Sequence, residues 1–217
     1  MTILNSTAYL SLFIQFITGL IDVWGLTLPT PSSVQIFRDL LIIELIVQVI
    51  EFIFYIWLIK NLNQPDITKY RYFDWFLTTP SMLITLMAFL SPPNKYTSVL
   101  DFLKANGSIV TQVLVLNWLM LTFGLLGEIG VLSQPVSATL GFIPFVLYFY
   151  LIYTHFTPNS LNQKRVYFYF LFFWSLYGVA AFLPYTQKNA MYNILDLFAK
   201  NFFGLFLVYI LYTSKNI

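Results

Sequence analysis

Charged residues are scarce in this sequence. Only 9% of its 217 residues are charged, whereas a soluble domain carries roughly 25%. Hydrophobic residues instead make up 59% of the chain, and aromatic residues 20%. This composition excludes an ordinary water-soluble globule and favours a protein that lies in a lipid bilayer.

Cysteine is absent and histidine occurs once, as His155. The first absence excludes a disulfide framework, a thiolate zinc site and a cysteine nucleophile. A single histidine excludes a metal site built from several histidines. Eleven basic and nine acidic residues give a net charge of +2, without the basic cluster that binding to a nucleic-acid backbone requires. We therefore expect no nucleic-acid partner.

Prolines in polar or turn-rich stretches divide the chain into seven apolar segments. Because a membrane-spanning helix needs about 20 apolar residues, each segment is long enough to cross a bilayer. We expect helices over about residues 5–27, 35–60, 71–90, 107–127, 134–155, 164–184 and 191–212. Pro80 and Pro144 fall inside helices, where neighbouring groups can satisfy the freed carbonyl. The prediction is an all-α bundle of seven transmembrane helices forming one domain, residues 1–217, without a removable signal peptide.

Basic residues between the segments predict the topology. With the N-terminus outside and the C-terminus inside, the cytoplasmic side carries Arg38, Lys95, Lys104, Lys164, Arg165 and Lys215. The outer side then carries Lys60, Lys69 and Lys188. Because cytoplasmic loops carry the excess of lysine and arginine, this orientation is favoured.

Ionisable residues inside membrane helices are costly and mark functional sites by default. The segments contain Asp22, Glu44, Glu51, Arg71, Asp74, Asp196 and Lys200. Arg71, Asp74 and Thr78 share one face of a helix, and Asp196 lies four residues before Lys200. A buried lysine keeps its positive charge when carboxylates lie beside it. The alternative is a structural ion-pair cluster that only fixes helix packing.

Three motifs resemble those of a known family. The stretches RYFDWFLTTP at 71–80, WSLYG at 174–178 and LDLFAKNFFG at 195–204 resemble helices three, six and seven of the microbial (type 1) rhodopsins. The resemblance implies a photoreceptor rather than an enzyme. It also implies all-trans retinal, attached to Lys200 through a Schiff base.

The resemblance also assigns residues around the chromophore. Asp74 and Asp196 match the positions of two counterions, and Arg71 the arginine on their extracellular side. Tyr177 is expected to donate its hydroxyl to Asp196. The retinal pocket is expected to contain Trp75, Thr78, Thr79, Met120, Leu121, Gly124, Trp174 and Tyr177, with Asn117, Phe142 and Phe145 aligned less securely.

The position that carries an internal proton donor in proton pumps of this family lies eleven residues after Asp74, and here it is Thr85. A hydroxyl cannot store a proton at neutral pH, so reprotonation is expected to be slow unless another acid, such as Glu44, substitutes. Asn117 likewise replaces an acid that is sometimes found in helix four. These departures weaken the alternative of an outward proton pump.

A polar stripe runs along an otherwise apolar segment. Glu44, Gln48 and Glu51 occur at i, i+4 and i+7, which places them on one helix face. Ser11, Gln15, Asn193 and Asn201 add polar groups from the first and last segments. Acids and amides in a row suit a cation path. Alternatively, they merely hydrogen-bond the helices together, at roughly 0.6 to 2 kcal/mol per contact.

This stripe and the short N-terminus look most like the group 1 viral rhodopsins of giant viruses. That resemblance implies a light-gated channel for Na⁺ and K⁺ that external Ca²⁺ blocks, located as a multi-pass protein in the host cell membrane. Arg71 and Asn193 would then lie toward the outside and Glu44 toward the cytoplasm. Homo-oligomers are common in the family. A photosensor that signals through a membrane partner is a third class.

Two further acids are expected to lie outside the path. Asp22, one turn before the first loop, is expected to cap its helix or face cytoplasmic water, with a role in a gate as the alternative. Glu128 is expected to be an exposed carboxylate, with a contribution to a calcium site as the alternative. The metal site itself stays unassigned.

Overall fold

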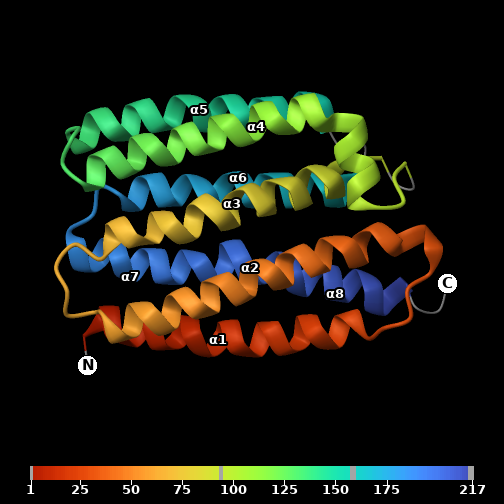
Figure 1. Ribbon diagram of the computed structural model, residues 1–217, viewed down its shortest axis with the longest axis horizontal. Coiled ribbons are helices and arrows are strands. Elements are labelled where there is room, and N and C mark those ends of the chain that lie inside the picture. The colour runs from red at the N-terminus through yellow and green to blue at the C-terminus, as the bar shows by residue number, and fades with distance from the viewer. Residues whose placement is uncertain (1, 93–94, 157–159, 215–217) are drawn as a thin grey trace.

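Long helices that run back and forth along one axis make up the chain (Figure 1). The computed structural model describes residues 2–92, 95–156 and 160–214. These residues form α1 (Ile3–Leu26), η1 (Ser32–Val34), α2 (Gln35–Lys60), α3 (Thr68–Leu90), α4 (Val99–Glu128), α5 (Gln134–Phe156), α6 (Leu161–Ala180), α7 (Tyr185–Asp196), η2 (Leu197–Asn201) and α8 (Phe202–Ser214). The predicted all-α class is confirmed, since no strand occurs in the described ranges.

Seven helical passes follow one another along the bundle, because α7, η2 and α8 form a single continuous pass. Six of the seven, in the described ranges, are long and apolar enough to cross a membrane. The remaining pass is α6, which begins with the polar turn LNQKR and continues with many tyrosine and phenylalanine residues. The N- and C-termini lie at opposite ends of the bundle (Figure 1). Which end faces the cytoplasm stays a prediction.

The start of α4 differs from the sequence prediction. We expected this helix to begin near residue 107, but it begins at Val99, with Ser98 accepting a hydrogen bond from the backbone N–H of Asp101. Asn106 then interrupts the helix with φ −121° and ψ 15°, and its amide donates to the carbonyl of Phe102. The polar stretch before residue 107 is therefore a capped helical segment joined to the membrane pass across a kink.

Pro80 lies inside α3, as predicted. A proline there leaves the carbonyl four residues earlier without its helical donor. That carbonyl belongs to Phe76, and the indole N–H of Trp118 in α4 donates to it at 3.1 Å. The side chain of a neighbouring helix thus satisfies the freed group.

The last pass contains a π-helical turn. We expected a regular helix over 191–212, but the pass begins at Tyr185 and widens into η2 before α8. Lys200 is one of the five residues of η2. Single π-helical turns occur often at functional sites, and this one contains the lysine of the predicted site.

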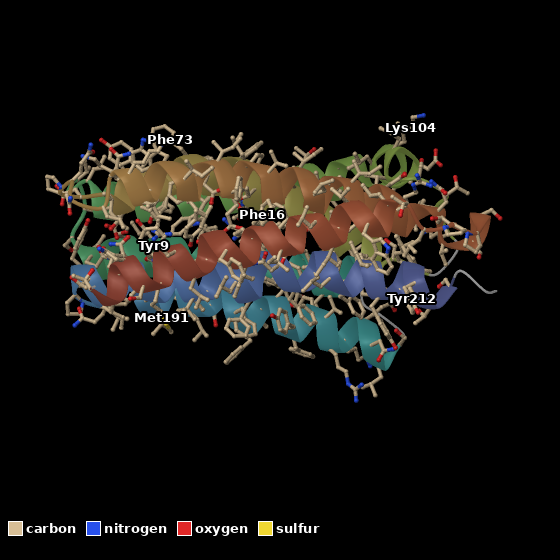
Figure 2. The ribbon with its side chains drawn as sticks, turned by 90° about the horizontal axis from the view of Figure 1, so that it is seen from below. Tyr9, Phe16, Phe73, Lys104, Met191 and Tyr212 are labelled. Carbon is tan, nitrogen blue, oxygen red and sulfur yellow. The ribbon has the colours of Figure 1, made fainter. Side chains whose placement is uncertain are left out.

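The bundle has an apolar outer surface and buries a set of ionisable groups within a largely apolar interior. Figure 2 shows large side chains such as Tyr9, Phe16 and Phe73 along the outer face of the helices, and Phe73 is 72% exposed. Arg71, two residues from Phe73, is fully buried. A lipid-facing surface with ionisable groups turned inward is the arrangement expected of a membrane bundle.

Candidate functional site

Lys200 lies in the middle of the bundle among three carboxylates. Its Nζ is 2.5 Å from Asp74 Oδ2, 3.2 Å from Glu51 Oε1 and 3.7 Å from Asp196 Oδ1. All four residues are at most 4% exposed. The sequence predicted Asp74 and Asp196 as neighbours of the lysine, whereas it assigned Glu51 only to a polar stripe. The structure therefore adds a third acid to the lysine site.

Asp196 is held from several sides. Tyr177 in α6 donates its hydroxyl to Oδ1 at 2.7 Å, which is the expected hydrogen bond. Tyr55 in α2 donates to Oδ2, also at 2.7 Å. Sequence reasoning missed Tyr55, because a tyrosine in an aromatic-rich helix carries no signal of its own. Arg71 completes the set, with its NH1 group 3.4 Å from Oδ2.

Arg71 is fixed by the amides of α7. Its guanidinium donates to the side-chain oxygen of Asn189 at 3.1 Å and to that of Asn193 at 2.5 Å. Asn193 in turn donates to the hydroxyl of Thr7 in α1 at 2.9 Å. Arg71 and Asn193 lie on the side of Lys200 that is nearer the N-terminal end of the bundle, because α7 runs from that end toward η2 (Figure 1). These contacts tie α1, α3 and α7 together.

An apolar cavity begins at Lys200 and extends toward α4 and α5. Its walls include the predicted pocket residues Trp75, Thr79, Met120, Leu121, Gly124, Phe142, Phe145, Trp174 and Tyr177. Tyr72, Tyr192 and Ala199 also line the cavity, and the sequence did not predict them. Thr78 does not line it, because its hydroxyl turns back to the carbonyl of Asp74 at 2.9 Å. Asn117 lies behind the wall and donates to the Thr79 hydroxyl at 2.8 Å.

Glycine allows aromatic side chains to close around this cavity at two points. A Cβ atom at position 124 would lie 2.6 Å from the hydroxyl oxygen of Tyr72, and one at position 178 would overlap the ring of Phe142. A Cβ at either position would therefore displace the side chain of Tyr72 or Phe142 and change the shape of the cavity wall. A narrow apolar cavity with a lysine amine at one end fits a long apolar aldehyde, since an amine condenses with an aldehyde and the carboxylates stabilise the resulting cation.

Buried polar side chains of α1, α2, α7 and η2 form a polar column beside Lys200. Glu44, Gln48 and Glu51 are each at most 2% exposed, so the predicted stripe does lie on one buried face of α2. Gln48 donates to the carbonyl of Lys200 at 3.4 Å. The remaining members, Ser11, Gln15, Asn193 and Asn201, are also buried. Some residues that the sequence assigned to an ion path are in direct contact, since the hydroxyl of Ser11 donates to the carbonyl of Asn193 at 2.7 Å and Arg71 donates to the side chain of Asn193.

Two acids lie in surroundings that the sequence did not predict. Asp22 is fully buried rather than facing water, because it packs against Gly204 in α8. Glu128 is not an exposed carboxylate, because Lys188 donates to both of its oxygens, at 2.7 and 2.9 Å. Within the described ranges no group of three or more histidine or acidic side chains is arranged to hold a metal ion.

The fold has seven helical passes, and a buried lysine lies at an apolar cavity between them. This combination is typical of the retinal-binding membrane proteins. The sequence profile of the bacteriorhodopsin-like protein family matches residues 4–214. The chain therefore belongs to this family, that of the microbial rhodopsins.

Individual relatives agree with this assignment. The crystal structure of the viral rhodopsin OLPVRII superposes with a TM-score of 0.83 at 27% sequence identity, covering 99% of each chain. The structure of a blue light-absorbing proteorhodopsin from Med12 has a TM-score of 0.77 at 18% identity, again over 99% of each chain. The green-light absorbing proteorhodopsin of Gamma-proteobacterium EBAC31A08 is 24% identical over 155 residues, which span 64% of this chain but only 59% of that relative.

Retinal is the cofactor of this family, held as a Schiff base on a lysine. Lys200 is that lysine here, because among the described residues it is the one buried lysine, and it lies at the cavity. The bound chromophore supplies absorption of visible light and isomerisation. The chain contributes the attachment point for this cofactor and the carboxylates around it.

Proposed function

We propose that this rhodopsin is a light-gated channel for monovalent cations, with the polar column of α1, α2, α7 and η2, together with Arg71 of α3, as its path. In this proposal Asp74 and Asp196 are the counterions of the charged nitrogen of Lys200. The residues of the path are Ser11, Gln15, Glu44, Gln48, Glu51, Arg71, Asn193 and Asn201. Carboxylates in the path favour cations over anions.

Unsatisfied polar atoms in the column carry the proposal. Buried polar groups nearly always have hydrogen-bond partners. In the described ranges most of the buried side-chain atoms without one belong to this column, including both amide atoms of Asn201. Side chains that served only to bind helices together would be paired with one another. Buried polar groups without partners suit the transient binding of water and cations.

Glu51 links the chromophore to the path. Its Oε1 is 3.2 Å from Lys200 Nζ, and Gln15 faces its carboxyl from α1. Any movement of charge at the lysine nitrogen therefore changes the electrostatic field that Glu51 experiences. In the proposal this change alters the carboxylate that the ion passes, and so couples light absorption to conduction.

The orientation with the N-terminus outside completes the proposal. It places Arg71 and Asn193 on the outer side of Lys200, with Glu44 on the cytoplasmic side. The excess of lysine and arginine at the C-terminal end of the bundle supports it. Lys104 lies at that end in Figure 2. Block by external Ca²⁺, homo-oligomers and a host cell membrane as the location stay predictions from the resemblance to group 1 viral rhodopsins.

An outward proton pump is the alternative, and one contact favours it. Thr85 occupies the position of the donor acid, yet its hydroxyl donates to Glu44 at 2.5 Å. An acid is therefore present on the side of Lys200 from which a pump would draw its proton.

Whole-cell voltage clamp under illumination separates the two functions. A channel passes current down the electrochemical gradient, so its photocurrent changes sign when the voltage crosses the reversal potential. A pump moves protons outward at every voltage near rest, so its current keeps one sign. We expect sign reversal, and a photocurrent that stays outward throughout would overturn the channel proposal. A pigment that responds to light without any current would favour the photosensor.

A further inference from the structure

Aromatic rings of α6 cover the outer side of the turn that carries Lys200. Phe198 and Phe202 lie two residues before and two residues after the lysine, and they are 46% and 37% exposed, whereas the lysine is 2% exposed. The lysine therefore points into the bundle while these two neighbours point outward. Tyr169 and Phe173 of α6 pack on the outward rings. None of the four aromatic residues lines the cavity or belongs to the polar column.

The four rings form a continuous stack between α6 and the last pass. The ring centroids of Tyr169 and Phe202 are 4.2 Å apart, and their planes are inclined by 29°. The centroid of Tyr169 also lies 4.5 Å from that of Phe173. The rings of Phe173 and Phe198 are 5.0 Å apart and nearly parallel, at 11°. Aromatic pairs attract at such short separations, so the stack ties α6 to both sides of the lysine turn.

One hydrogen bond joins this stack to the backbone of the turn. The hydroxyl of Tyr169 donates to the carbonyl of Phe198 at 2.8 Å. Hydrocarbon offers a hydroxyl no partner, so this bond is costly to break on a lipid-facing surface. On the inner side, Gln48 of α2 donates to the carbonyl of Lys200. Two carbonyls of η2 thus accept side-chain donors, one from the outside and one from the inside of the bundle.

The π-helical conformation of η2 gives these contacts their importance. π-Helices are rare, so a single π turn persists where its surroundings favour it over the α-helix. The lysine nitrogen lies 2.5 Å from Asp74 and 3.7 Å from Asp196. Because the energy between charges varies inversely with distance, a small shift of the turn changes these interactions. We propose that Tyr169 is a positioning residue for the chromophore, whose hydroxyl fixes the turn and thereby the distance from the Lys200 nitrogen to its carboxylates.

The inference rests on retinal attachment at Lys200 and not on cation conduction, so purified full-length protein with retinal is sufficient to test it. Tyr169→Phe removes the hydroxyl and keeps the ring in the stack. Negative charge near the chromophore nitrogen stabilises the ground state more than the excited state, in which positive charge has moved along the polyene. As the nitrogen moves away from its carboxylates, the absorption maximum should shift to longer wavelength. The C=N stretch in the Raman spectrum should also change less on transfer to D₂O, because the N–H forms a weaker hydrogen bond.

A chemical probe of the attachment adds a rate to these spectra. Hydroxylamine cleaves the C=N bond in the dark and gives retinal oxime and the free amine of Lys200. A turn that is held less tightly exposes this bond more often. Tyr169→Phe should therefore bleach about two- to tenfold faster, which is the factor that corresponds to one net hydrogen bond. Tyr209→Phe removes an exposed hydroxyl from the same pass and should change neither the spectra nor this rate.

A second variant separates the hydroxyl from the rings. Phe173→Leu removes one ring of the stack and keeps the hydrogen bond, so it should make the protein less stable to heat but shift the absorption maximum less than Tyr169→Phe does. An equal shift in the two variants would assign the positioning to the rings and overturn the role of the hydroxyl.

Two further results would contradict the inference. Tyr169→Phe that bleaches faster on heating, but keeps the absorption maximum, the Raman spectrum and the hydroxylamine rate of the unmodified protein, would show that the hydroxyl only stabilises the bundle. A variant that equals Tyr209→Phe in every measurement would exclude any role. Neither result changes the photocurrent test of the channel. Unmodified protein that stays colourless with retinal would overturn this inference together with the attachment at Lys200.

Discussion

Removal of the Tyr55 hydroxyl tests whether the network around Asp196 stabilises the protein. In Tyr55→Phe the Asp196 carboxylate loses the hydroxyl that donates to its Oδ2 at 2.7 Å. Asn193 loses the same hydroxyl, which lies 3.2 Å from its side-chain oxygen. The substituted ring keeps its shape and packing. Asp196 retains Tyr177 on its other oxygen, so the substitution removes a hydrogen bond without removing the carboxylate.

The expected cost follows from the type of bond. A hydrogen bond to a charged group stabilises a protein by about 1.5 to 3 kcal/mol. Each 1.36 kcal/mol changes a rate tenfold. If the hydrogen bond is broken in the transition state of thermal bleaching, the visible absorbance should therefore bleach roughly ten- to hundredfold faster in the variant. Tyr177→Phe should have an effect of similar size. The double variant should depart from the sum of the two effects, because both hydroxyls bind one carboxylate.

The assay follows visible absorbance at a fixed elevated temperature. Tyr209→Phe is the matched control, because Tyr209 is 63% exposed on the outside of α8. Its bleaching rate should equal that of the unmodified protein. A Tyr55→Phe variant that bleaches no faster than this control would refute the stabilising role of the network.

Three further predictions concern the chromophore, the path and the helix break. Lys200→Ala should give protein without visible absorbance after addition of retinal, and retained colour would contradict attachment at this residue. Glu51→Gln should reduce the photocurrent several-fold at equal expression, because it removes the acid shared by the lysine site and the path. The control variant Glu128→Gln, at the N-terminal end of the bundle, should leave the photocurrent unchanged. Equal currents in the two variants would exclude Glu51 from the path. Trp118→Phe should destabilise the protein by about 1 to 3 kcal/mol, because the carbonyl of Phe76 loses its donor, and an unchanged bleaching rate would show that this carbonyl finds another partner.

The apolar segments and the three motifs were sufficient to predict the seven passes and the cofactor. Hydropathy reports length and composition, and these determine where a membrane helix lies. The resemblance of the third, fourth and sixth helices to those of the microbial rhodopsins also led to residues that line the cavity, among them Trp75, Met120 and Trp174. The predicted beginning of α4 was wrong, because a capped helical segment of mixed polarity has the composition of a loop.

Contacts between distant helices could not be predicted in the same way. Glu51 belonged to a stripe on α2, and nothing in its own segment placed it beside Lys200 in η2. Tyr55 and the pairing of Glu128 with Lys188 depend on how the passes pack, which the sequence of one helix does not specify. The π-helical turn at η2 is a local feature, yet LFAKN contains neither proline nor glycine to mark it.

The reversal potential of the photocurrent tests the central claim most directly. Replacing nine tenths of the external Na⁺ with a large organic cation lowers its concentration tenfold, which corresponds to about 1.4 kcal/mol or about 60 mV for one charge. With Na⁺ as the principal internal and external permeant cation, a channel predicts that the reversal potential moves toward negative voltage by nearly this amount. A photocurrent with no reversal, or with a reversal potential that follows only the proton gradient, would contradict the account.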